Sequence, residues 1–173
     1  MDQEKFLYQK EIDLKFIILL CLLLAHNIHA SISNELNNFF NSDLKFIQTS
    51  LNQTKNSFDE SEGIFKRSTN NDINVEVVSP FKEKYILTKE YIEIHDLEFD
   101  QIKKITKEEY KNNLFISYLI NGFDEKNITT TDQNTFVIDD GNKKYQFKYV
   151  NKNTLQVRFK DNMDVTNIIK FYK

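Results

Sequence analysis

The sequence has few of the residues that carry covalent or metal chemistry. Its 173 residues include one cysteine (Cys21), one proline, three glycines and no tryptophan. Two of its three histidines, His26 and His29, lie within the first thirty residues, which leaves His95 as the histidine of residues 31–173. A site built on a thiol nucleophile, or on several histidines around a metal, is therefore excluded from residues 31–173.

The longest apolar run is also short. Phe16–Ala25 is a run of ten apolar residues, whereas a helix that spans a bilayer needs about 20. This length is typical of the core of a secretory signal, and Ile28 and Ala30 occupy the two positions that a signal peptidase reads. We predict that residues 1–30 are a signal peptide cleaved after Ala30. Because the first fifteen residues lack a net positive charge, an uncleaved anchor and a buried helix remain alternatives.

The sequence also lacks a large excess of positive or negative charge. The chain has a formal net charge of −3, and this near balance argues against nucleic acid as a partner, since nucleic-acid-binding domains present a basic face. Residues 31–173 are long enough for a single domain with a hydrophobic core. We find no repeat and no linker in this range, so we expect one domain there.

Hydrophobic periodicity predicts a short helix followed by strands. The helix opens at Ser33–Leu36 with Asn34 or Ser33 as its cap. Its predicted buried stripe is Leu36, Phe39 and Phe40. The period then changes to two, which is typical of strands. The predicted strands of this part are Ile47–Gln53, Glu62–Lys66, Ile73–Val77, Tyr85–Leu87, Tyr91–Ile94 and Gln101–Thr106.

The second part of the chain predicts one more helix and a meander. Lys107–Ile120 has helical spacing, and Gly122 is its expected stop. The predicted strands of this part are Phe136–Ile138, Tyr145–Tyr149, Leu155–Phe159 and Ile169–Phe171, and apolar residues alternate with polar ones in Tyr145–Tyr149 and Leu155–Phe159. The predicted loops are Asn52–Ser61, Ser68–Asp72 and Asn127–Asn134. The expected fold class is α+β, an antiparallel sheet whose one apolar face is covered by helical segments.

Five short motifs follow one another along the chain, and their order and spacing are informative. They are Ile47-x-Thr49-x-Leu51-x-Gln53 after the first helix, Gly63 before Lys66-Arg67, the strand Ile73–Pro80, His95-Asp96-x-x-x-x-Gln101-Ile102, and Asn113-Leu114-Phe115. In this order and spacing, the chain resembles the periplasmic outer-membrane lipoprotein carriers, the LolA family. The resemblance covers residues 34–171.

The resemblance implies a fold and a function. The fold is a strongly curved antiparallel sheet, an incomplete barrel, with short helices forming a lid over a hydrophobic cavity. The function is that of a non-enzymatic periplasmic chaperone, a monomer without cofactor or metal. Such a carrier shelters the acyl chains of lipoproteins, accepts them from an inner-membrane lipoprotein-releasing ABC complex and passes them to an outer-membrane lipoprotein receptor.

Apolar inward positions are expected to line the cavity, because aliphatic and aromatic side chains hold acyl tails by contact area alone. They are Ile47, Leu51, Phe65, Val75, Ile92, Ile94, Phe115, Leu119, Phe136, Tyr145, Phe147, Tyr149, Leu155, Val157 and Phe159. By resemblance, Arg67 is a residue at the cavity mouth whose guanidinium bonds lid carbonyls. If Gly63 and Ile73–Val77 fix the register instead, that place falls on Thr69.

Other interpretations stay open at this point. Alternating apolar strands are more often plain core than a lipid site, and Arg67 can equally be a solvated charge at a strand end. His95 is a candidate pH switch or a packing residue. The competing functions are a lipoprotein-sensing regulatory module of the same fold, a carrier of another lipid, and an exported hydrolase. The hydrolase requires two acidic side chains that converge inside a cleft.

Overall fold

The computed structural model describes residues 31–52, 56–139, 141, 143–161 and 163–173. Its helices are α2 (Ile32–Phe40), α3 (Lys107–Tyr110), α4 (Leu114–Asn121) and the 3-10 helix η1 (Glu125–Asn127). Its first strands are β1 (Leu44–Asn52), β2 (Ser57–Arg67), β3 (Ile73–Ser79), β4 (Glu83–Leu87), β5 (Tyr91–Asp96) and β6 (Gln101–Thr106). The later strands are β7 (Ile128–Asp132), β8 (Thr135–Asp139), β9 (Lys144–Asn151), β10 (Thr154–Lys160) and β11 (Thr166–Tyr172).

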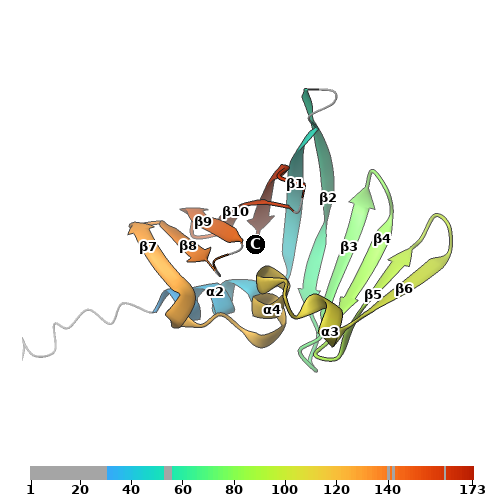
Figure 1. Ribbon diagram of the computed structural model, residues 1–173, viewed down its shortest axis with the longest axis horizontal. Helices are drawn as coiled ribbons and strands as arrows, with labels where there is room; N and C mark the ends of the chain where they lie inside the picture. Colours follow the sequence, from blue (N-terminus) through green and yellow to red (C-terminus); the bar gives the residue numbers. More distant parts are fainter. Residues whose placement is uncertain (1–30, 53–55, 140, 142, 162) are drawn as a thin grey trace, which may run out of the picture. The chain divides into compact units, whose positions relative to one another are not determined.

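The eleven strands form one open antiparallel sheet in the order β6-β5-β4-β3-β2-β1-β11-β10-β9-β8-β7. The short helices lie against one face of it (Figure 1), which we call the inner face. β6 and β7 are the two edges and do not pair, so the sheet is not closed. The expected α+β class and antiparallel meander are confirmed in this coarse form.

Two meanders meet at the middle of the sheet. β1 to β6 pair in sequence order on one side, and β7 to β11 do so on the other. They are joined where β1 pairs with β11, with Thr49 opposite Ile168 and Phe46 opposite Phe171. Residues 31–173 thus form one compact unit that contains all described strands.

Local sequence signals explain where the helices begin and end. The Ser31 hydroxyl accepts a hydrogen bond from the Asn34 amide, so Ser31 is the cap of α2, two or three positions before the expected cap. The helix predicted over Lys107–Ile120 is broken into α3 and α4, because Asn113 caps a new helix by accepting from the Ile116 amide. Gly122, with a φ of 94°, ends α4 as expected.

Three strand predictions need correction. β2 begins at Ser57 and β7 covers Ile128–Asp132, so two segments predicted as loops are partly strands. β7 is an exposed edge strand and therefore lacks the apolar alternation of a buried one. In β1, the buried residues are Leu44 and Phe46, so the inner face is one residue out of phase with the predicted Ile47 and Leu51.

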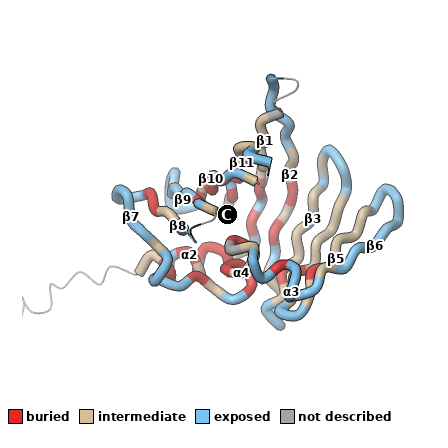
Figure 2. Tube along the Cα trace, viewed as in Figure 1, coloured by how far each residue is buried: buried red, intermediate tan, exposed pale blue. Residues whose placement is uncertain are grey.

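The inner face is filled unequally. Over β8 to β10 it packs into a closed aromatic core, whereas the hairpin ends of β1–β2, β3–β4 and β5–β6 are exposed (Figure 2). Phe40 of α2 lies between the two parts, with ring centroids 5.1 Å from Phe171, 5.5 Å from Phe123 and 5.8 Å from Phe65. The predicted buried stripe of α2 is confirmed, because Leu36, Phe39 and Phe40 are at most 2% exposed.

The predictions for residues 1–30, including Cys21 and the cleavage after Ala30, fall outside the described residues. None of the helices that the structure describes is long and apolar enough to cross a bilayer.

Candidate functional site

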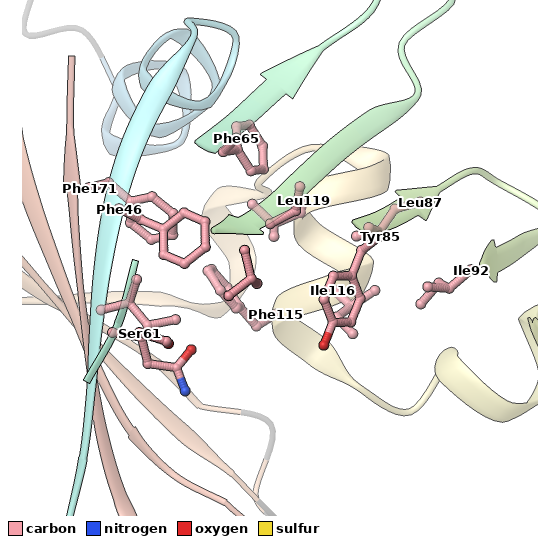
Figure 3. Close-up of a pocket in the computed structure, with 14 residues that line it drawn as sticks. Phe46, Ser61, Phe65, Tyr85, Leu87, Ile92, Phe115, Ile116, Leu119 and Phe171 are labelled. Atoms are coloured by element: carbon pink, nitrogen blue, oxygen red, sulfur yellow. The ribbon is translucent and has the colours of Figure 1, made fainter. Parts of the chain in front are cut away.

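An apolar pocket lies between α4 and the first five strands, and β11 closes its side. Its volume is about 290 Å³, near the lower end of the roughly 300–1,000 Å³ of ligand pockets. Figure 3 shows side chains from the sheet and from α4 pointing toward one another across it. The lining residues are Phe46, Gln48, Ser61, Phe65, Val75, Val77, Tyr85, Leu87, Ile92, Phe115, Ile116, Leu119, Ile169 and Phe171.

Strand alternation places the sheet half of this lining. Val75 and Val77 of β3 point to the inner face, and Tyr85 stands opposite Val75 on β4. On β5, Ile92 pairs with Leu87 and extends the wall toward the edge of the sheet. These positions carry β-branched, aliphatic and aromatic side chains, which present hydrocarbon to the pocket without a charge.

α4 supplies the opposite wall. Its Phe115 ring stacks on Tyr145 at 5.6 Å between centroids and meets Phe147 edge-to-face at 5.9 Å. These contacts anchor α4 on the filled part of the core, while Ile116 and Leu119 lie along the pocket. The same helix thus packs on the core at one side and covers the pocket at the other.

A glycine makes room for one pocket wall. A Cβ added at Gly63 would lie 2.2 Å from the Glu76 carbonyl oxygen and 2.5 Å from Cζ of Phe46. Phe46 and Gly63 are cross-strand partners on the inner face. The Phe46 ring therefore lies over the space that a side chain at position 63 would fill, and in this position it lines the pocket.

One end of the lining is polar but uncharged. Gln48 and Ser61 are partners across β1 and β2, and both line the pocket. Behind them, the Gln48 amide nitrogen donates to Oδ1 of Asn167 at 3.2 Å, and the Ser50 hydroxyl donates to the same oxygen at 2.5 Å. Asn167 is only 5% exposed, so this network satisfies polar groups that would otherwise be costly to bury.

Tyr85 is the titratable side chain among the lining residues. Its hydroxyl donates to a carboxylate oxygen of Glu83 at 2.5 Å. Burial raises the pKa of Tyr85 above its ordinary value, and the hydrogen bond and negative charge of Glu83 raise it further. The phenol is therefore protonated at neutral pH, and it acts here as a hydrogen-bond donor and a flat apolar wall.

Arg67 joins β2 to both major helices. Its Nη2 donates to the Leu119 carbonyl of α4 at 2.7 Å, and its Nε donates to the Phe40 carbonyl of α2 at 3.5 Å. Nη1 donates to the Asn71 carbonyl at 3.2 Å. Burial lowers the pKa of the guanidinium below its ordinary value. The alternative residue, Thr69, is exposed in the turn after β2.

The structure brings together five of the residues predicted to line a cavity: Phe65, Val75, Ile92, Phe115 and Leu119. A second group packs in the core, where α2, α4 and Phe123 fill the inner face completely. This group consists of Phe136, Tyr145, Phe147, Leu155 and Val157, with Tyr149 and Phe159 half-buried against it. For this group, the alternative of plain core is the one that the packing supports. Ile94 is half-buried on β5 opposite Tyr85 and is not among the lining residues of the pocket.

Ile47 and Leu51 lie elsewhere. Successive side chains of a strand point to opposite faces, and Phe46 and Gln48 point to the pocket. Ile47 and Leu51 therefore point to the outer face, where Leu51 lies opposite Phe58 across β1 and β2. They do not line this pocket.

Sequence reasoning missed nine lining residues. They are Phe46, Gln48, Ser61, Val77, Tyr85, Leu87, Ile116, Ile169 and Phe171. Val77 could have been found, because it is in phase with Val75 in the predicted strand Ile73–Val77. Ile169 and Phe171 likewise alternate with Lys170 in the predicted last strand. Gln48 and Ser61 had no signal, because a polar residue on an inner face follows from its partners and not from periodicity.

The chemistry that this lining offers is binding by contact. Among the described residues that line the pocket there is no carboxylate, lysine, arginine, histidine or cysteine, and no group of described side chains is arranged to hold a metal ion. His95 lies outside the pocket, with Nε2 3.3 Å from a Glu93 carboxylate oxygen. The pocket thus suits an apolar guest with a neutral polar end.

No protein-family model matches this sequence, and a search of curated proteins finds no match.

Proposed function

We propose that this protein is a periplasmic carrier of the LolA type, which shelters the acyl chains of lipoproteins between the inner and the outer membrane. In this proposal the protein acts without cofactor, takes its cargo from an inner-membrane ATP-driven release complex and gives it to an outer-membrane receptor. The observation that carries the proposal is the uncharged apolar pocket between α4 and β1–β5.

The lining supports an acyl guest on energetic grounds. Each buried methylene contributes about 0.8 kcal/mol, so a chain of ~16 carbons gains roughly 13 kcal/mol on leaving water. Phe46, Phe65 and Leu119 provide such contact without directional bonds. A guest held by area alone can be released to a partner that offers more area, which a carrier requires.

Arg67 supports a lid over this pocket. It ties the last turn of α4 and the end of α2 to β2 through main-chain carbonyls. In the proposal, α2 and α4 are the lid, the sheet is an incomplete barrel, and the Arg67 bonds hold the closed state. Entry of acyl chains moves α4 and breaks the bond to Leu119.

The pocket volume of about 290 Å³ also favours a second candidate. It is small for three acyl chains and suits a smaller acyl guest without rearrangement. A carrier of another lipid is therefore the alternative function. The two differ in cargo and in the size of the lid movement, and they share the pocket.

Two neighbouring valines of β3 allow a direct test. Val77 lines the pocket, whereas Val78 is 45% exposed and is not among the lining residues. Residues 31–173, exported and purified without detergent, are examined by mass spectrometry for bound acyl compounds, and a fluorescent palmitoyl ester is titrated in solution. We expect Val77→Asp to lower probe affinity at least about tenfold, because an ionised carboxylate in this lining is unpaired. We expect Val78→Asp to leave the affinity unchanged.

The outcomes separate the candidates. Acylated protein bound to the purified chain supports the lipoprotein carrier, and free lipid alone supports the alternative. If neither co-purifies and the probe does not bind, both are wrong. Equal loss of affinity in the two valine variants would mean that the probe binds outside the pocket.

A further inference from the structure

Exposed apolar side chains gather at one end of the β3–β6 part of the sheet. We call this surface the apolar tip, and it consists of Val78, Phe81, Leu97, Phe99 and Ile102. Phe81 is 66% exposed and Phe99 is 70% exposed. The two hairpin ends that carry them are adjacent, because the Leu97 amide donates to the Lys82 carbonyl at 2.9 Å. Single exposed hydrophobic residues are ordinary, whereas a cluster of this kind marks an interaction surface.

The turns that present the apolar tip are ordered by their own hydrogen bonds. Oδ1 of Asp96 accepts from the amide of Glu98 at 3.0 Å and from that of Phe99 at 3.1 Å. The strand pairing of Glu83 with Asp96 reaches the base of both turns. The structure therefore holds Leu97 and Phe99 outward on a fixed loop, away from the core.

The charges around the apolar tip balance. Within 79–84 and 95–104 the lysines are Lys82, Lys84, Lys103 and Lys104, and the carboxylates are Glu83, Asp96, Glu98 and Asp100. A surface with interspersed charges and no net sign has no long-range attraction for a polyanion. It is complementary to headgroups that carry both charges, as zwitterionic phospholipids do.

The apolar tip is continuous with the pocket. Val77 lines the pocket and pairs with Glu83, the last pair before the turn that carries Phe81. Tyr85, two residues beyond that pair on β4, lines the pocket as well. The part of the lining that Val77 and Tyr85 form therefore lies close, along β3 and β4, to the turn that carries Phe81.

We propose that the apolar tip is the contact of this protein with a zwitterionic lipid surface, into which Phe81, Leu97 and Phe99 insert at the depth of the headgroups. The contact brings the end of the pocket to the acyl chains of the membrane. This inference rests on the proposed function for the identity of the guest. It adds a docking surface that works by apolar insertion, so its strength does not depend on salt.

Vesicles of pure phosphatidylcholine test the inference with residues 31–173, the compact unit that carries the whole described sheet. Flotation at low and at high salt measures the bound fraction. We expect binding at both, and we expect the double variant Phe81→Ser/Phe99→Ser to lower the partition coefficient about 100-fold, or about tenfold for each ring removed from lipid. Both rings are exposed, so the variant retains the core.

Phe58 provides the matched control. It is 65% exposed at the end of the β1–β2 hairpin, outside the apolar tip, and Phe58→Ser is expected to bind vesicles like the unchanged protein. The inference is overturned if the double variant binds equally well, or if the unchanged protein does not bind. It is also overturned if the unchanged protein is a dimer and the double variant is a monomer, since the apolar tip would then contact a second copy.

The palmitoyl ester in vesicle-free solution separates this inference from the proposed function. The double variant is expected to keep its affinity for the ester, while Val77→Asp loses it. If no protein binds the ester, the proposed function is wrong, and vesicle flotation still decides whether the apolar tip is a lipid contact.

Discussion

Asn37 and Phe123 exchange two hydrogen bonds between α2 and the segment that follows α4. The Phe123 amide donates to Oδ1 of Asn37 at 2.8 Å, and Nδ2 of Asn37 donates to the Phe123 carbonyl at 3.2 Å. The Phe123 ring stacks on Tyr118 at 5.3 Å and on Phe40 at 5.5 Å. One amide side chain thus fixes the end of α4 against α2.

Asn37→Ala is expected to lower the free energy of unfolding by about 1–3 kcal/mol, because both main-chain groups of the buried Phe123 lose their partner. Urea unfolding measures the loss. Asn38→Ala, at the next and exposed position of α2, is the control and is expected to change little. Equal losses in the two variants would assign the effect to helix propensity.

Arg67→Leu is expected to loosen α4. Loss of the charged hydrogen bond to the Leu119 carbonyl costs about 1.5–3 kcal/mol, which corresponds to roughly a ten- to hundredfold faster exchange of the α4 amides. Hydrogen exchange read by mass spectrometry measures this. Lys66→Leu removes a neighbouring charge from the exposed face and is expected to leave α4 unchanged. Protected α4 amides in Arg67→Leu would contradict the role of Arg67 as a latch.

The phase of β1 is testable with adjacent residues. Phe46→Ala removes a buried ring and is expected to cost about 3–5 kcal/mol of unfolding free energy. Ile47→Ala removes a half-buried side chain from the outer face, and we expect it to cost about 1 kcal/mol. Urea unfolding measures the loss in both variants. A larger loss for Ile47→Ala than for Phe46→Ala would mean that Ile47, as predicted from the sequence, faces the core.

Gly63→Ala is expected to cost about 1–3 kcal/mol, because the added Cβ meets the Glu76 carbonyl and the Phe46 ring. Gly141 is the contrasting glycine. A Cβ there has no atom within 4 Å, so Gly141→Ala carries only the strain of its φ of 84°. Thermal unfolding compares them. A Gly63→Ala protein as stable as the unchanged one would show that β2 and β3 shift apart without penalty.

Acid is expected to weaken the N-terminus of α2 through Glu125. The Ser33 and Ser31 hydrogen bonds to its carboxylate hold the pKa of Glu125 below its usual range. The folded pKa is thus below the unfolded one, so the stabilisation is present above the unfolded pKa and is lost as pH falls through the folded one. Glu125→Gln is expected to be less stable than the unchanged protein at pH 7. Urea unfolding across the acid range is expected to show the difference shrink as pH falls below the ordinary pKa of a glutamate, about 4.3, and a constant difference would contradict it.

The strands that sequence predicts well are those with local partners. In β3, β5, β9 and β10, apolar and polar residues alternate over most of the strand, and each strand pairs with its neighbour in sequence. β1 fails because both of its phases carry apolar side chains. The polar side chains of Gln48 and Ser50 can face inward because both donate hydrogen bonds to Oδ1 of Asn167, which lies near the far end of the sequence.

The pocket was harder to predict than the sheet. Val75 and Val157 have the same alternation, yet Val75 lines the pocket and Val157 is 0% exposed in the core. The difference comes from the rings of Phe39, Phe115 and Phe123, which pack on one half of the inner face. Periodicity gives the direction of a side chain, and the volume that helices leave above it follows only from tertiary packing.

The pairing of β1 with β11 has a consequence for the speed of folding. In every other pair of neighbouring described strands, the two strands follow one another in the sequence. Each meander can therefore assemble from short-range contacts. The pair that joins them must first close a loop of nearly the whole described chain, and closing it costs configurational entropy before any contact compensates. We therefore expect the rate-limiting step of folding to be the meeting of these two strands, with Phe46 and Phe171 among the first long-range contacts.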